Sequence, residues 1–190
     1  ALTERLEQKV IRFRPGRSQE RILEGRQEVL YVAEGSGTLR VNGTEHALES
    51  EMGVYLTPGD RYSVENDGPE ELLAISVTAP QEAPTAGAHG VTVRYADQPV
   101  LPASPNREFR YLVNQDIGCR EVTQFVGTIP PGRAGMHSHV YDEVVYVIEE
   151  RAPGRPSLVT DVGVRLPAQL TASGRAMLAA LPAAQVRALF

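Results

Sequence analysis

Short apolar runs separated by turn residues fill the first 80 positions of the chain. Glu28–Val32 and Leu72–Val77 are the strongest of these runs, because β-branched, aromatic or aliphatic residues occupy most of their positions. Asn42-Gly43 lies between two such runs and favours a tight hairpin, since both residues tolerate positive φ. Short strands at this spacing predict an antiparallel barrel or jelly roll.

The same pattern predicts further strands along the chain. They are expected at Val10–Arg14, Thr38–Val41, Gly53–Leu56, Tyr62–Val64, Val91–Tyr95, Phe109–Val113, Glu121–Val126 and Glu143–Ile148. The last of these has the composition of a buried strand. A short helix is expected at Ala1–Lys9, where charged and apolar residues mix.

Two stretches depart from the strand pattern. Residues 81–106 contain four prolines among many small residues, and they predict a mostly extended interdomain linker. Near the end of the chain, Thr171–Leu181 predicts a helix that is capped by Thr171 or Ser173. Pro182 ends this helix and opens a second short one.

One stretch carries candidate metal chemistry. His137 and His139 are two positions apart, and Glu143 follows four positions after the second histidine. Residues two apart in a strand point to the same face, and Glu143 has the same parity. Two imidazoles and one carboxylate suit Fe(II), Mn, Zn, Ni or Cu, so we expect a divalent metal at these three residues. The alternative is a chance cluster of surface side chains.

Composition and charge narrow the range of partners. The formal net charge is -5, from 19 Lys and Arg against 24 Asp and Glu, which disfavours nucleic acid as a partner. No apolar run approaches membrane-spanning length and no signal peptide is evident, so we expect no membrane association and a cytoplasmic location. Cys119 is the one cysteine and is expected to be a small buried residue, whereas His46 and His89 are expected in solvated loops.

The metal stretch resembles motif 1 of the cupin superfamily. A glycine turn at Gly132, the His137-x-His139 pair, Glu143 and a β-run ending at Ile148 follow that motif, whereas Glu149 stands where the family has a closing glycine. The resemblance implies metal ligation by the two histidines and the glutamate.

The first half of the chain resembles a complete cupin domain without its metal ligands. Glu28 to Gly35 follows the end of motif 1, and motif 2 is matched at Gly53, Pro58, Gly59 and Asn66. Ile22 and Glu24 stand at the histidine positions of motif 1, and Tyr62 stands at the histidine position of motif 2. This barrel is therefore expected to be structural, or to bind an organic ligand without metal.

An internal duplication supports a bicupin. Pro15-Gly16-Arg17 matches Pro131-Gly132-Arg133, and Glu28–Val32 matches Glu143–Val147. The second barrel is incomplete, because no histidine follows His139 and the later strands are missing from the sequence. Residues 156–190 instead resemble part of the effector-binding domain of IclR-type transcriptional regulators.

These features predict a mainly β fold of two cupin-like antiparallel barrels, the second incomplete, with a short helical C-terminal segment. The expected domains are a barrel without metal ligands at 1–80, the linker at 81–106, a partial barrel with the metal motif at 107–150, and a strand–helix tail at 151–190. The tail is either a fragment joined from a second gene or a helical appendage that packs on a barrel.

Three functions fit this organisation. The first is a metal-dependent small-molecule enzyme of the dioxygenase, isomerase or decarboxylase type, as the cupin resemblance implies. The second is a non-catalytic module that binds or senses a small molecule. The third is a truncated or fused gene product without activity. The resemblance also implies that the chain forms a homodimer.

Overall fold

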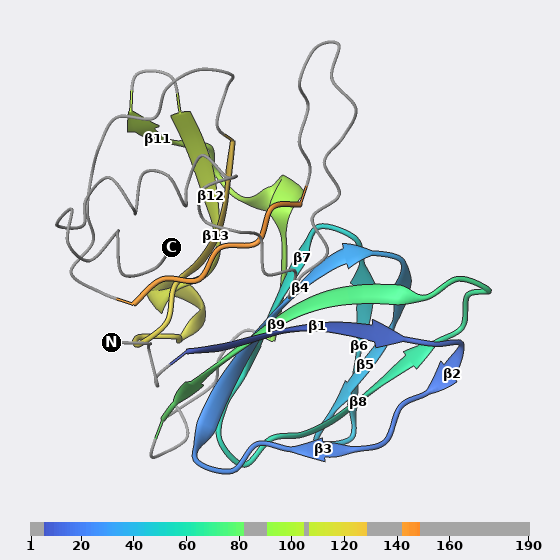
Figure 1. Ribbon diagram of the computed structural model, residues 1–190. Coiled ribbons are helices and arrows are strands. Elements are labelled where there is room, and N and C mark those ends of the chain that lie inside the picture. Colours follow the sequence, from blue (N-terminus) through green and yellow to red (C-terminus); the bar gives the residue numbers. More distant parts are fainter. Residues whose placement is uncertain (1–5, 82–90, 105–106, 129–141, 149–190) are drawn as a thin grey trace, which may run out of the picture. The chain divides into compact units, whose positions relative to one another are not determined.

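The computed structural model describes residues 6–81, 91–104, 107–128 and 142–148 (Figure 1). These residues belong to one compact unit and are almost entirely antiparallel β-structure. The first sheet has the strand order β1 (Glu7–Phe13), β9 (Leu72–Pro80), β4 (Arg26–Glu34), β7 (Met52–Leu56) and β10 (Thr92–Arg94). The second sheet has the order β2 (Gly16–Arg17), β8 (Arg61–Asn66), β5 (Ser36–Val41) and β6 (Thr44–Glu49), with β3 (Arg21–Ile22) also paired to β8.

A third, smaller sheet follows in the chain. It consists of β11 (Leu101–Ser104), β12 (Arg107–Val113) and β13 (Gln124–Thr128). Two 3-10 turns, η1 (Tyr95–Asp97) and η2 (Gln115–Ile117), lie in the connections before and after the first two strands of this sheet.

A hydrophobic core draws its side chains from both large sheets. Leu30 and Val32 of β4 meet Leu39 and Val41 of β5 in one buried cluster, and Val54 of β7 joins them. Alternate residues of a strand point to opposite faces, so each of these strands contributes every second residue to this core. The two sheets therefore pack face to face around one core, as expected for the antiparallel barrel or jelly roll that the spacing of short strands predicts.

The opposite face of the first sheet is also buried at its central strands. Val29 and Tyr31 of β4 and Tyr55 of β7 form a second apolar cluster with Leu112 and Val113 of β12. Six consecutive residues from Gln27 to Val32 are consequently buried, without the alternation that a strand facing water would show. The double burial explains why Glu28–Val32 is a continuous apolar run after its first residue.

The hairpin at Asn42-Gly43 is confirmed. Asn42 has φ 50 and Gly43 has φ 85, and the flanking Val41 and Thr44 pair across the turn. The Asn42 amide donates to the Asp60 carboxylate at 2.7 Å, which ties this hairpin to the turn before β8. Strand β6, which the hairpin leads into, was not predicted from the sequence.

Two of the predicted secondary-structure elements are wrong. Residues 7–9 belong to strand β1, which pairs with β9, and not to a helix. The segment Glu143–Ile148 forms no strand, although its composition predicts a buried one. Val145 and Val147 are 72% and 63% exposed, because no strand among the described residues pairs with this segment.

The described part of the predicted linker is structured. Strand β10 extends the first sheet by pairing with β7, and β11 pairs with β12. The second barrel over 107–150 stays a prediction, since the described strands there are those of the small third sheet. The predicted tail at 151–190 lies outside the described residues.

Gly53 of β7 lies in close contact with Leu112 of β12 and Gln124 of β13. A Cβ at this position would lie 2.8 Å from the Leu112 Cβ and 3.0 Å from the Gln124 Oε1. We expect Gly53→Ala to lower the free energy of unfolding by about 1–3 kcal/mol through overpacking, as measured by urea denaturation. Gly127→Ala is the matched control, because an added Cβ there meets nothing closer than 3.7 Å. Equal losses in the two variants would contradict the close contact.

Candidate functional site

A carboxylate lies inside the first barrel. Glu28 is 0% exposed and sits on β4, on the face that also carries the core residues Leu30 and Val32. A buried ionised carboxylate is strongly unfavourable unless hydrogen bonds and opposite charge compensate it. The neighbours of Glu28 therefore define the chemistry of this centre.

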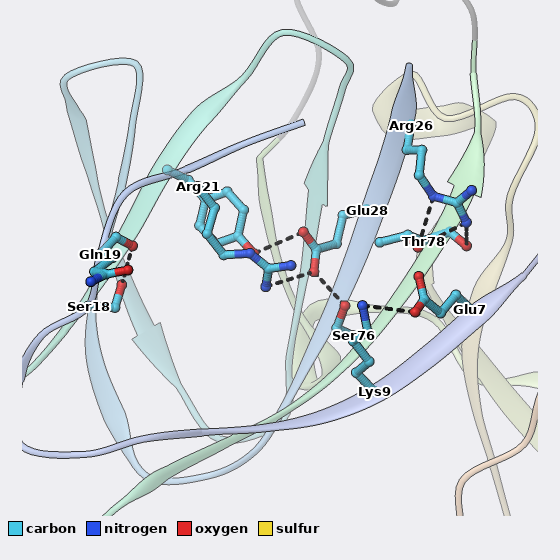
Figure 2. A network of polar contacts seen from close by, with 10 residues as sticks. Glu7, Lys9, Ser18, Gln19, Arg21, Arg26, Glu28, Ser76 and Thr78 are labelled. Atoms are coloured by element: carbon cyan, nitrogen blue, oxygen red, sulfur yellow. Dashed lines mark hydrogen bonds and ion pairs between the residues drawn. The ribbon is translucent and has the colours of Figure 1, made fainter. Parts of the chain in front are cut away.

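Three side chains from three different strands converge on Glu28. The Tyr62 hydroxyl of β8 donates to Glu28 Oε2 at 2.9 Å. The Ser76 hydroxyl of β9 donates to Oε1, and Arg21 Nη1 of β3 lies 3.7 Å from the same oxygen. Figure 2 shows Arg21 and Ser76 pointing toward the carboxylate from opposite sides. Both oxygens of the carboxylate are thus compensated within the barrel.

The surroundings of Tyr62 raise the pKa of its phenol. Burial raises its pKa well above the ordinary range, and the nearby Glu28 carboxylate raises it further. The Arg21 guanidinium lies 5.6 Å from the centre of the Tyr62 ring, in a cation–π arrangement. The phenol therefore remains a neutral hydrogen-bond donor to Glu28 across the physiological pH range.

Arg21 and Ser76 are the residues of this centre that could not be singled out from the sequence, and the strand register explains the case of Arg21. Ile22 and Glu24 were aligned with the histidine positions of the cupin motif, but both side chains are exposed. Arg21 pairs with Tyr62 across β3 and β8, and the buried Leu23 has the same parity. A shift of one residue along a strand exchanges its two faces, so the inward-facing position is 21 and not 22.

The residues of this centre do not fit a transition metal. Tyr62 and Ser76 use their hydroxyl protons on the carboxylate, and Arg21 brings a positive charge to the side of Glu28 where a cation would bind. A hard divalent ion would meet one carboxylate and a repelling guanidinium. Within the described ranges, no group of three or more His, Cys, Asp or Glu side chains could hold a metal ion.

The metal site predicted from the sequence lies mostly outside the described residues. His137 and His139 fall in the range 129–141, which the structure does not describe, and Glu143 is an exposed residue in a segment without strand structure. The ligation of a metal by these three residues therefore stays a prediction.

A second polar contact joins β4 to the later part of the chain. Gln27, which is 1% exposed, donates to Glu121 Oε2 at 3.0 Å and accepts from the Cys119 thiol at 3.2 Å. Cys119 is buried, as predicted, and the Val122 carbonyl, 3.1 Å from its sulfur, is an alternative acceptor for the same thiol proton. Burial raises the pKa of its thiol, so Cys119 is a protonated structural residue and not a nucleophile.

A groove of about 480 Å³ lies between the edges of the two large sheets. His46 and Glu49 of β6 line one side, and Arg94 of β10 and Asp97 of η1 line the other. An ion pair between Arg94 and Glu49 spans the groove. His46 was expected in a loop but lies in strand β6, where it is half-buried.

Comparison with known proteins identifies the first barrel. Residues 9–78 match the family model of the cupin domain. This part of the chain is a cupin domain. The Glu28 centre lies within it, between its two sheets. A search of the curated proteins finds no match.

Several solved structures are similar to parts of this chain. A Pseudomonas aeruginosa protein named "Putative Glyoxylate Induced Protein" is 17% identical, with a TM-score of 0.53 over 62% of this chain and 46% of that chain. A predicted oxalate decarboxylase from Thermotoga maritima is 23% identical, with a TM-score of 0.37 over 39% of this chain and 65% of that chain. The Ylba protein of E. coli is 18% identical, with a TM-score of 0.41 over 57% of this chain and 56% of that chain.

The first of these similarities shows the cupin fold and nothing finer, given its low identity. The chain spans less than half the length of the Pseudomonas protein. Among the residues that the structure describes, no helix has the length and apolar character needed to cross a bilayer.

Tyr62→Phe tests the hydrogen bond to the buried carboxylate. We expect the free energy of unfolding to fall by about 1.5–3 kcal/mol, because a charged acceptor loses a buried donor. Urea denaturation of Tyr31→Phe is the control, since Tyr31 is also buried but packs in the second apolar cluster. A loss no larger than that of the control would contradict the role of the Tyr62 hydroxyl.

Alkaline pH provides an independent test of the same phenol. The unfolded chain loses the Tyr62 proton near pH 10, whereas the native chain keeps it because its pKa is raised. The native state then binds more protons, so the stability contributed below pH 10 is lost as the pH rises, by about 1.4 kcal/mol per pH unit. Denaturation at several pH values above 10 is expected to show a shallower decline in Tyr62→Phe than in the wild type.

Proposed function

We propose that the protein is a metal-binding cupin protein with two unequal halves. The cupin domain at residues 9–78 is a metal-free scaffold, and His137, His139 and Glu143 in the later half hold a divalent metal. The observation that carries the proposal is the spacing of these three residues, which repeats the first-half pattern around Glu28 with two histidines added.

The donor set supports a catalytic metal. Two neutral imidazoles and one carboxylate bind Fe(II), Mn, Zn, Ni or Cu, and a set of three protein ligands leaves positions open for water or substrate. When bound, the metal would supply Lewis-acid or O2-activating chemistry to a small carboxylate- or phenol-type substrate. The Glu143 carboxylate would offset one of the two positive charges and so limit the electrophilicity of the centre.

The contrast between the two halves is consistent with this division. In the first half, the position that the metal would occupy is served by Arg21, Tyr62 and Ser76 around Glu28. In the second half, the sequence provides two imidazoles near the equivalent glutamate. A small-molecule ligand and a homodimer belong to the same proposal.

Metal analysis of the purified chain tests the proposal. We expect about one equivalent of divalent metal per chain in the wild type and close to none in His137→Ala, because the loss of one of three ligands removes most of the affinity. His46→Ala is the matched control: it removes a histidine from strand β6 and should leave the metal content unchanged.

Equal metal content in the wild type and in His137→Ala would reject the proposed ligands. Thermal stabilisation by a small carboxylate that persists in excess chelator would instead indicate a binding module without metal chemistry. The two readouts therefore separate the enzyme from the sensor.

A further inference from the structure

We infer that Arg21 replaces a bound metal ion in the cupin domain, and that its guanidinium provides the positive charge that allows Glu28 to remain buried. This inference concerns the first half of the chain and is independent of the metal proposed at His137, His139 and Glu143.

The position of the Glu28 carboxylate requires a compensating positive charge. Glu28 is fully buried between two sheets, where a bare charge would be strongly unfavourable. Two hydroxyl groups supply hydrogen bonds, but they supply no positive charge. Arg21 is the residue whose basic group lies within ion-pair distance of Glu28 among the described side chains, at 3.7 Å.

Arg21 can compensate the charge of Glu28 because its side chain reaches from solvent to the buried carboxylate. Its side chain is 39% exposed, while that of Glu28 is 0% exposed. The Arg21 side chain therefore keeps contact with water although its guanidinium lies near the carboxylate, which reduces the desolvation that a fully buried ion pair would suffer. The Tyr62 ring lies beside the guanidinium and restricts its orientation.

The strand register fixes the arrangement. Arg21 pairs with Tyr62 across β3 and β8, so the cation and the phenol reach Glu28 from adjacent positions. Ser76 reaches Glu28 from β9, the neighbour of β4 in the first sheet. Figure 2 shows Arg21 and Ser76 on either side of Glu28, which is fully buried.

A double-mutant cycle tests the replacement. Arg21→Met removes the charge at similar length, and we expect the unfolding equilibrium constant to rise about tenfold. Glu28→Gln alone should raise it only about threefold, because Arg21 can turn toward water and the hydroxyl groups can bond to an amide. The decisive expectation is that Arg21→Met/Glu28→Gln is more stable than Arg21→Met, since the second change removes the uncompensated charge.

One further variant and one control cycle test whether the charge of Arg21 and its burial are what matter. Arg21→Lys retains the charge and should keep most of the stability that Arg21→Met loses. The pair Arg61–Glu20 is the control, because it lies 3.5 Å apart on the neighbouring surface with side chains 60% and 56% exposed. The cycle Arg61→Met/Glu20→Gln should show almost no coupling.

The cycle is measured by urea denaturation in the His137→Ala background, with and without EDTA. The inference predicts the same coupling in both conditions. Wild-type stability in Arg21→Met, or a double variant no more stable than Arg21→Met, would overturn it. A loss of stability in EDTA in the chain that retains Arg21 would also overturn it, because the cupin domain would then depend on a metal. Metal content at His137 plays no part in any of these outcomes.

Discussion

The central strands β4 and β7 of the first sheet are buried on both faces, and this constraint organises the described structure. Strand β4 lies between β7 and β9, and its residues point alternately into two separate apolar clusters. One cluster fills the sandwich, and the other lies beneath β12 and the turn that follows it. Water does not reach the six central residues of strand β4, so each polar residue among them needs a partner from elsewhere in the chain.

Gln27 and Glu28 show how this requirement is met. These neighbours are 1% and 0% exposed and point to opposite faces of the sheet. Glu28 is compensated within the barrel by Arg21, Tyr62 and Ser76, whereas Gln27 bonds to Cys119 and Glu121, more than 90 positions later in the chain. The two polar residues therefore fix the first sheet to both of its neighbouring layers.

The sequence predicted most strands of the cupin domain, because apolar runs and turn residues are local signals. Strand β6 was missed because only Leu48 of its six residues is buried, so it has almost no hydrophobic pattern. The helix expected at 1–9 was wrong at residues 7–9, because β9 provides a pairing edge for residues 7–13, which no local pattern reveals. Arg21 was missed for a related reason, since the strand register decides whether position 21 or 22 faces inward.

The internal repeat shows the limit of composition as a guide. Glu28–Val32 and Glu143–Val147 are nearly the same sequence, yet the first is the central strand of a sheet and the second forms no strand. The difference lies in the partners: β7 and β9 flank the first copy. Glu143 was predicted from the sequence as a metal ligand, which stays a prediction, whereas the exposed surroundings of Glu143 could not be predicted because they depend on strand pairing.

The packing of β12 on the outer face of the first sheet limits where recombination can divide this gene without destabilising the protein. A gene cut between the cupin domain and the third sheet would expose the outer side chains of β4 and β7 to water and leave Gln27 without its hydrogen bonds. Recombination can therefore exchange the two parts only together, or only where a new segment supplies an equivalent apolar cover.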